Sequence, residues 1–152
     1  MAGKENPEAG FTLLELMIVL GILAMAVTMA MPLLNRPAGD AALMATARQI
    51  ASNMRIARAS AIRDNADRLL TVDLAARRFW VGGVTAASPI AGGIAVDVVA
   101  PEKELVTARQ ARMRFHADGS ASGGSIVLRA AGRSVTVELD WMTGHANVRR
   151  EP

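Results

Sequence analysis

The hydrophobic and polar residues of the chain follow three different patterns from its N-terminus to its C-terminus. A short hydrophilic segment, residues 1–10, is followed by an apolar run in which residues 16–34 carry no formal charge. At about 1.5 Å rise per residue, a helix of this length covers most of the hydrocarbon thickness of a bilayer. The pattern therefore predicts a hydrophobic, membrane-spanning helix over residues 11–34.

A second, amphipathic helix is predicted within residues 35–64. An interruption that contains proline and glycine ends the apolar run, and Asp40 is expected to cap the helix that follows. Apolar residues then recur at the three- to four-residue spacing of an amphipathic helix: Leu43, Ala47, Ile50, Met54, Ala57 and Ala61. We expect this stripe to cover a sheet and Arg55 and Arg58 to lie in solvent; a basic partner-binding face is the alternative.

Residues 65–152 change to a period of two and predict a β-rich domain. Leu70, Val72 and Leu74 alternate with polar or small residues, and a short turn leads to residues 79–81, so a β-hairpin is expected. Further strands are predicted over residues 94–99, 104–106, 112–115, 125–130 and 134–139. Their inward-facing residues should be Met113, Phe115, Val135, Val137 and Leu139. A helix followed only by strands indicates an α+β fold, with the helix packed on antiparallel sheet.

Composition narrows the classes of function without changing this outline. Cysteine is absent, so the chain can form neither disulfides nor a thiolate metal site. The formal net charge of +3 comes from scattered arginines, and the chain has no tyrosine. Because aromatic stacking platforms are scarce, nucleic-acid binding is disfavoured.

One charged residue lies near the start of the apolar run. A carboxylate in an apolar environment costs a few kcal/mol unless it is paired or lies near the membrane interface. Glu15 is therefore either a partner for a positive charge or a residue at headgroup level. Cleavage at Ala24-Met25-Ala26, as in an ordinary secretory signal, is a further open alternative, although the leader lacks the positive charge of such a signal.

The segment Gly10-Phe11-Thr12-Leu13-Leu14-Glu15-Leu16 resembles the processing motif of type IV pilins and type II secretion pseudopilins. The resemblance implies that a prepilin peptidase removes residues 1–10 by cleavage between Gly10 and Phe11, and that the new Phe11 amine is methylated. It also implies a single-pass inner-membrane helix with the C-terminal domain in the periplasm. The family pairs Glu15 with the Phe11 amine of a neighbouring subunit. Opposite charges attract strongly in a low-dielectric bundle, so we predict that Glu15 sets helix register.

A glycine-rich stretch, residues 115–126, is the second distinctive feature. A phosphate-binding loop would need a Gly-Lys-Ser/Thr ending that opens a helix, but this stretch has no lysine and precedes a β-patterned segment. Glycine supplies positive φ and aspartate bonds back to a turn, so a strand connection is the preferred interpretation. Its structural residues are expected to be Asp118, Gly119, Ser120, Gly123 and Gly124.

Catalytic, cofactor and metal sites are not predicted. His116, Asp118 and the nearby serines are adjacent in sequence, and adjacency in a turn does not create the nucleophile-base-orienter geometry of a hydrolase. Only one other histidine, His145, is present, without cysteines or a clustered acidic ligand set. We therefore expect a non-enzymatic protein.

The F-x-x-D-G-S-x-S-G-G-x-I pattern of residues 115–126 also resembles the GspH/FimT family of minor pseudopilins. The resemblance implies a pilin-like fold and a structural subunit at or near the tip of the type II secretion pseudopilus, which helps folded proteins to cross the outer membrane. Implied partners are other minor pseudopilins, the major pseudopilin, the prepilin peptidase, the inner-membrane secretion platform, membrane lipid and exported proteins. The alternative is a FimT-like minor pilin that binds DNA for uptake through Arg133, Arg149 and Arg150. Residues 82–111 carry no motif.

Overall fold

The computed structural model describes the backbone of residues 12–34, 39–107 and 109–151, and the side chains of these residues except those of 27–34. The chain divides into two compact units, residues 1–36 and residues 37–152. The boundary lies between residues 36 and 37, within residues 35–39, the segment that contains proline and glycine.

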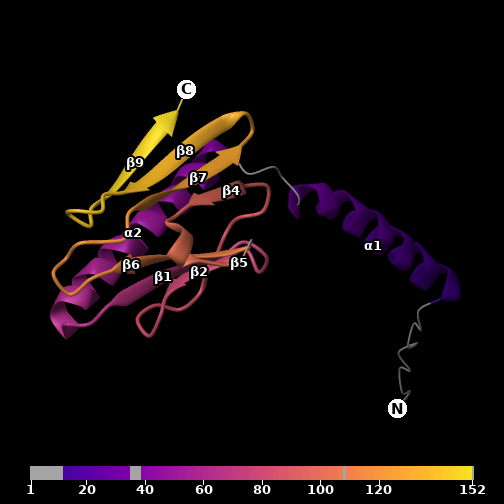
Figure 1. Cartoon of the computed structure of the whole chain (residues 1–152). Helices are drawn as coiled ribbons and strands as arrows, with labels where there is room; N and C mark the ends of the chain where they lie inside the picture. Colours follow the sequence, from indigo (N-terminus) through magenta and orange to yellow (C-terminus); the bar gives the residue numbers. More distant parts are fainter. Residues whose placement is uncertain (1–11, 35–38, 108, 152) are drawn as a thin grey trace, which may run out of the picture. The chain divides into compact units, whose positions relative to one another are not determined.

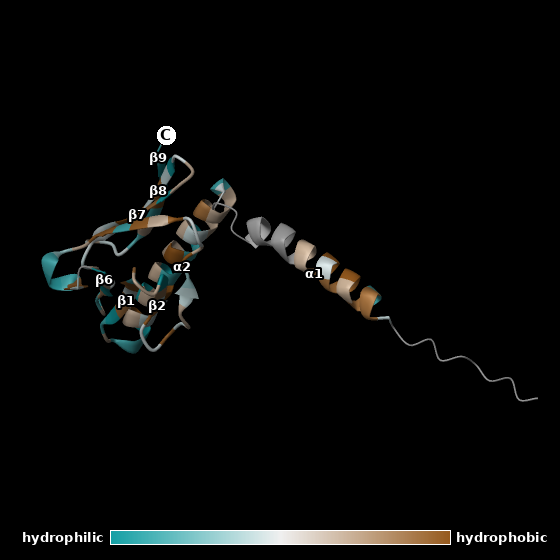
Figure 2. Cartoon of the chain, turned by 90° about the vertical axis from the view of Figure 1, so that its right-hand side faces the viewer, coloured by the Kyte–Doolittle hydropathy of each residue, from teal (hydrophilic) through white to brown (hydrophobic). Residues whose placement is uncertain are grey.

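The first unit consists of helix α1, Leu13–Leu34. Figure 2 colours much of its described length brown, for hydrophobic residues, and the apolar side chains are largely exposed as far as Met25. Thr12 begins the helix, since its hydroxyl oxygen accepts a hydrogen bond from the Glu15 amide at 3.2 Å. This is the N-terminal half of a capping-box arrangement, for which Thr-x-x-Glu is the sequence signature. Phe11, the first residue of the predicted helix, lies outside the described residues.

Among the helices that the structure describes, none combines the length and the apolar character that a membrane span requires.

Helix α2, Asp40–Asp64, starts the second unit and matches the predicted amphipathic helix over its described length. The expectation that Asp40 is the N-cap is wrong. Gly39 takes that position with extended backbone and no side-chain cap, whereas Asp40 lies in the first turn and its carboxylate pairs with Arg133 at 2.5 Å. At the other end, Asn65 adopts a left-handed conformation, and the Ala66 amide donates to the Ala61 carbonyl. This bond satisfies one carbonyl of the last turn.

Two antiparallel sheets complete the domain (Figure 1). The first has the order β3-β2-β1-β6-β5, and the second, called sheet B here, has the order β4-β7-β8-β9. The strands are β1 Arg68–Asp73, β2 Arg78–Val81, β3 Ser88–Pro89, β4 Ala95–Val99, β5 Leu105–Thr107, β6 Gln110–Phe115, β7 Gly124–Ala130, β8 Arg133–Leu139 and β9 Ala146–Glu151, with a 3-10 turn η1 at Glu102–Glu104.

Helix α2 packs against strands of both sheets, and one hydrophobic core results. Its predicted apolar stripe is buried, as are Met113, Phe115, Val135, Val137 and Leu139. The hydrophobic cluster is drawn wholly from residues 42–148. Residues 37–152 thus carry a complete core and can be studied as an independently folding domain.

The expected β-hairpin is confirmed as β1–β2, and the helix on antiparallel sheet confirms the α+β fold. Two strands were not predicted. β3 has only two residues, and β9 has the sequence Ala-Asn-Val-Arg-Arg-Glu, in which only Val148 is a large apolar residue. An edge strand with one solvated face needs little hydrophobicity, so its alternation is weak in the sequence.

Candidate functional site

The N-terminal residues with predicted roles lie partly outside the structure. Gly10 and Phe11, the proposed cleavage and methylation residues, fall outside the described residues. Glu15 lies in the first turn of α1 with an exposed side chain. The capping role of Thr12 was not predicted, although the Thr-x-x-Glu signature indicates it. The pairing of Glu15 with a neighbouring subunit stays a prediction.

The glycine-rich stretch forms the connection between β6 and β7. The Gly119 amide donates to the His116 carbonyl, and the His116 amide donates to the Ser120 carbonyl, both at 2.9 Å. The Asp118 carboxylate accepts hydrogen bonds from the Ser120 hydroxyl at 2.6 Å and from the Ser120 amide at 2.9 Å. These bonds favour the ionised form and hold the pKa of Asp118 below its usual value. Gly119 supplies the positive φ of +87° that the turn requires.

Arg58 fastens this connection to helix α2. Its Nε–H donates to the Gly119 carbonyl at 3.0 Å, and the side chain is half-buried. A Cβ at Gly119 would lie 3.1 Å from the Arg58 guanidinium, and a Cβ at Gly144 would lie 3.0 Å from its Cδ and Nε. Arg58 therefore occupies a slot between two glycines that belong to different loops. The expectation that Arg58 is merely solvated is wrong, whereas Arg55 is exposed as expected.

The turn between β8 and β9 supplies the second of these glycines. The Gly144 amide donates to the Asp140 carbonyl at 2.9 Å. The Asp140 carboxylate accepts bonds from the Thr143 amide and hydroxyl at 2.7 and 2.8 Å, and this lowers its pKa. The Trp141 carbonyl accepts a bond from the Ala121 amide at 2.9 Å, which joins the turn directly to the β6–β7 connection. Arg58, the connection and the turn thus form one unit, which we call the Arg58 clasp.

Two further glycines of the stretch allow close packing. A Cβ at Gly123, where φ is +75°, would lie 3.1 Å from the Cβ of Trp141. A Cβ at Gly124, where φ is +120°, would lie 2.5 Å from the Val99 carbonyl oxygen in the neighbouring strand. A larger residue at Gly124 would therefore have a strained backbone, and its Cβ would collide with the Val99 carbonyl oxygen.

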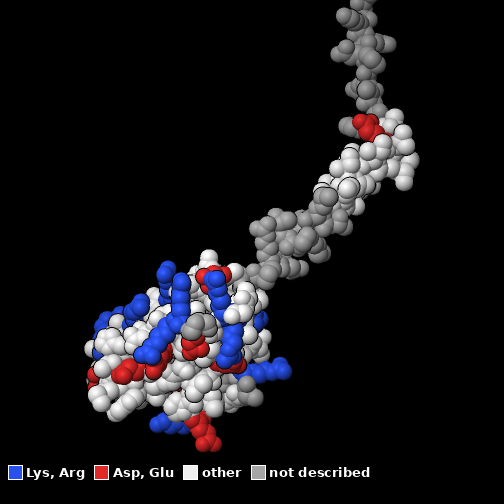
Figure 3. Space-filling model, turned by 90° about the horizontal axis from the view of Figure 1, so that it is seen from above, with Lys and Arg blue, Asp and Glu red and all other residues white. Residues whose placement is uncertain are grey.

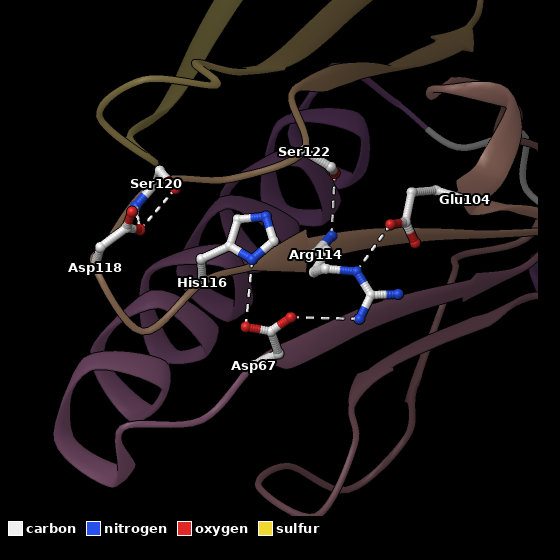
Figure 4. Close-up of polar contacts among 7 residues, drawn as sticks. All are labelled: Asp67, Glu104, Arg114, His116, Asp118, Ser120 and Ser122. Atoms are coloured by element: carbon white, nitrogen blue, oxygen red, sulfur yellow. Dashed lines mark hydrogen bonds and ion pairs between the residues drawn. The ribbon is translucent and has the colours of Figure 1, made fainter.

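A charged network lies on the outer side of β6 (Figure 4). Arg114 Nε donates to Glu104 Oε1 at 2.9 Å, and Arg114 Nη1 lies 3.5 Å from Asp67 Oδ2. His116 Nδ1 lies 3.2 Å from the other oxygen of Asp67. The Glu104 side chain is only 2% exposed, and its bond raises the pKa of Arg114. This network could not be predicted from the sequence, because Asp67 lies far along the chain from Arg114 and His116, and Glu104 belongs to a separate element.

The side chains around His116 do not form a hydrolytic triad. In the described part of the chain, His116 interacts with Asp67, while Asp118 bonds to Ser120 and the Ser122 hydroxyl accepts a bond from the Arg114 amide. No group of three or more histidine, cysteine or acidic residues that could hold a metal is found among the described residues. The polar groups here hold backbone segments in place.

The three arginines suggested for DNA binding do not share one surface. In sheet B, Val135 pairs with Arg150 and Thr136 pairs with Arg149. Because side chains alternate between the faces of a strand, Arg150 lies on the core-facing side with the buried Val135, and Arg149 lies on the opposite side. Arg133 pairs with Asp40 at the beginning of α2, whereas Arg149 lies 3.8 Å from Glu138.

A capped N-terminal helix followed by a helix packed on antiparallel sheets defines a pilin-like subunit. Residues 6–31 match the family described as the prokaryotic N-terminal methylation motif. Residues 46–144 match the family described as type II transport protein GspH. The chain belongs to the GspH family of type II transport proteins. The relationship predicted from residues 115–126 is confirmed.

A sequence relative agrees with this placement, and a solved structure has a similar fold. The chain is 27% identical over 136 residues to the type II secretion system protein H of Xanthomonas campestris pv. campestris, covering 89% of this chain and 79% of the relative. The minor pseudopilin EpsH from the type 2 secretion system of Vibrio cholerae has a similar fold. It aligns with a TM-score of 0.54 and 12% identity over 72% of this chain and 95% of EpsH. The minor pilin FimU of Pseudomonas aeruginosa aligns less well, with a TM-score of 0.48, 12% identity and coverage of 72% of this chain and 93% of FimU.

Proposed function

We propose that this protein is a structural subunit at or near the tip of the periplasmic pseudopilus, where it helps the type II secretion system to export folded proteins across the outer membrane. The observation that carries the proposal is the combination of two family matches in one chain. The methylation motif at residues 6–31 supplies a helix that can pack within a filament. The GspH match at residues 46–144 supplies a self-contained domain that can present a surface to partners.

The N-terminal helix has two successive roles in this proposal. It first holds the subunit in the inner membrane with residues 37–152 in the periplasm, and it then packs among the helices of other subunits. Cleavage by the prepilin peptidase between Gly10 and Phe11 leaves a single residue ahead of the helix cap at Thr12. The methylated Phe11 ammonium would then lie beside the positive end of the helix dipole, where a cation is disfavoured.

Glu15 offsets this unfavourable charge. It is exposed in the first turn of α1, the position at which a carboxylate interacts favourably with the helix N-terminus. Its side chain is therefore available to pair with the Phe11 ammonium of a neighbouring subunit. The proposed partners in this packing are the other minor pseudopilins and the major pseudopilin. The inner-membrane secretion platform and the exported proteins are proposed to contact the assembled filament.

Crosslinking between subunits tests the role of Glu15. The chain has no cysteine, so single cysteines introduced in α1 and in a partner pseudopilin report one defined contact. Glu15→Ala should reduce that crosslink in membranes of the secreting cell. Glu8→Ala is the matched control, because this acidic residue lies in the leader that cleavage removes. Crosslinking by the Glu15→Ala variant at the unmodified level would contradict the proposed pairing.

DNA capture by a FimT-like minor pilin is the competing proposal. Its basis is the basic character of Arg133, Arg149 and Arg150, but these residues are divided between two faces and two of them pair with carboxylates. Binding through phosphate contacts should weaken steeply as salt rises. A gel-shift titration of residues 37–152 with duplex DNA at two salt concentrations distinguishes the proposals. Salt-sensitive binding by the domain would favour DNA capture.

A further inference from the structure

Arginines from three elements gather at the end of the domain where helix α2 begins. Arg48 lies on α2, Arg133 at the start of β8 and Arg150 in β9. They line two adjoining depressions of about 470 and 460 Å³ that share Asp40 and Arg150. Figure 3 shows several basic side chains on the face of the domain that is seen from above, with acidic side chains between them. We call Arg48, Arg133 and Arg150 the arginine cluster.

The cluster has more positive charge than its own acidic neighbours neutralise. Asp40 is engaged by Arg133. Among the described residues, Arg48 and Arg150 form no ion pair, and both side chains are exposed. Glu151 also lines one of the depressions, but its carboxylate accepts hydrogen bonds from the Ser134 and Thr136 hydroxyls, each at 3.1 Å. Two guanidinium groups thus remain available for an external anion.

The position of the cluster along the chain indicates which anion it meets. Helix α1 ends at Leu34 and α2 begins at Asp40, so five residues separate the two helices. Five residues, even when fully extended, span at most about 18 Å. If α1 is anchored in the inner membrane as the proposed function requires, the cluster is tethered within reach of the membrane surface. Basic residues close to a membrane are attracted to anionic lipid headgroups.

We propose that the arginine cluster binds the anionic phospholipid headgroups of the inner membrane before the subunit enters the filament. Guanidinium groups suit this role because their planar donors match the oxygens of a phosphate. Arg48 and Arg150 bind the phosphates, and Arg133 contributes positive charge while it remains paired with Asp40. The bound domain would be held against the membrane surface, and entry into the filament would break these contacts.

Vesicle binding by residues 37–152 tests the proposal without the membrane helix. The probes are vesicles of phosphatidylglycerol mixed with phosphatidylcholine and vesicles of phosphatidylcholine alone, in a cosedimentation assay at low salt. We expect binding to the anionic vesicles only. Arg48→Gln and Arg150→Gln should each lower the partition coefficient about fivefold, and the double variant about 25-fold. Arg149→Gln, on the opposite face of sheet B, should change it less than twofold.

Several outcomes would overturn the proposal. These are equal binding to both kinds of vesicle, equal losses for Arg149→Gln and Arg150→Gln, and competition by inorganic phosphate at the same concentration as the lipid phosphate. Binding to duplex DNA that depends on Arg48 and Arg150, without a preference for anionic vesicles, would also overturn it in favour of nucleic acid. Circular dichroism of each variant establishes that the domain is folded.

A separate measurement distinguishes failure of this inference from failure of the proposed function. Cells that lack the protein are complemented with the unmodified chain or with the Arg48→Gln/Arg150→Gln variant, and secreted protein is quantified. If secretion is lost in cells without the protein but the domain does not bind anionic vesicles, only the lipid-binding role of the arginine cluster is rejected. Unchanged secretion without the protein rejects the proposed function, whatever the vesicles show.

Discussion

Replacement of Arg58 by alanine should destabilise the domain and loosen both loops of the Arg58 clasp. The change removes the bond from Nε to the Gly119 carbonyl and the packing of the Arg58 stem against Gly144. A hydrogen bond that involves a charged group contributes about 1.5–3 kcal/mol. Because Arg58 is half-buried rather than fully enclosed, we take the lower part of this range and add a modest loss of packing. The expected reduction in the free energy of unfolding is about 2–3 kcal/mol.

Two further variants separate the contributions of Arg58. Arg58→Lys keeps the charge and most of the stem but loses the Nε donor, so its loss should be smaller, about 1 kcal/mol. Arg55→Ala is the matched control, because Arg55 is exposed on the same helix and its replacement should change stability by less than about 0.5 kcal/mol.

Urea denaturation of residues 37–152 measures these differences, with unfolding followed by tryptophan fluorescence and by circular dichroism. Trp141 lies in one of the loops that the clasp holds, so its fluorescence also reports on the local structure. Faster hydrogen exchange at the Gly119 and Gly144 amides should accompany the loss of stability in Arg58→Ala. An Arg58→Ala domain as stable as the Arg55→Ala domain would refute the role assigned to the clasp.

Three other predictions concern single features of the domain. Gly124→Ala should cost about 3 kcal/mol of stability in urea denaturation, because the new Cβ would strain the backbone at positive φ and would also collide with the Val99 carbonyl. Gly132→Ala, where φ is +73° but the surrounding space is open, should cost only about 1–2 kcal/mol, and equal losses would contradict this reasoning. Arg114→Met should lower the free energy of unfolding by about 3 kcal/mol, because it leaves the buried Glu104 carboxylate unpaired. In a double-mutant cycle, adding Glu104→Gln to the same chain should recover part of this loss, and strictly additive losses would contradict the pairing. Hydrogen bonds from Arg63 and Arg68 lower the pKa of Asp64 to about 2, so the stability from this carboxylate should be present above about pH 4 and disappear as the pH falls toward 2; an NMR titration that gives the ordinary pKa would contradict it.

The sequence was most informative where residues close in the chain decide the structure. The apolar residues within residues 40–64 recur every three to four positions and predicted helix α2, because the period of a helix is visible within a few turns. Met113 and Phe115 alternate with arginines, and this period of two predicted which residues of β6 face the core. The glycines of residues 119–124 indicated a strand connection rather than a phosphate site, because no lysine and no following helix accompany them.

Contacts between residues far apart in the chain could not be predicted. Arg58 meets Gly119 across 61 positions, so an arginine on the polar side of a helix looked like any solvated residue. The burial of Glu104 depends on Arg114 and on the fold of η1, and neither leaves a local pattern. The separation of Arg149 from Arg150 follows from the pairing of β9, a strand whose few apolar residues concealed it.

Protein secretion by cells that lack this chain tests the central claim most directly. The gene for this protein is deleted in its own bacterium. The proteins that the type II system exports are then quantified in the medium and in the periplasm, and uptake of labelled DNA is measured in the same cells. We predict that the exported proteins accumulate in the periplasm, that the unmodified chain restores their release, and that DNA uptake is unchanged. Normal release of these proteins, with loss of DNA uptake, would contradict the assignment to the secretion pseudopilus.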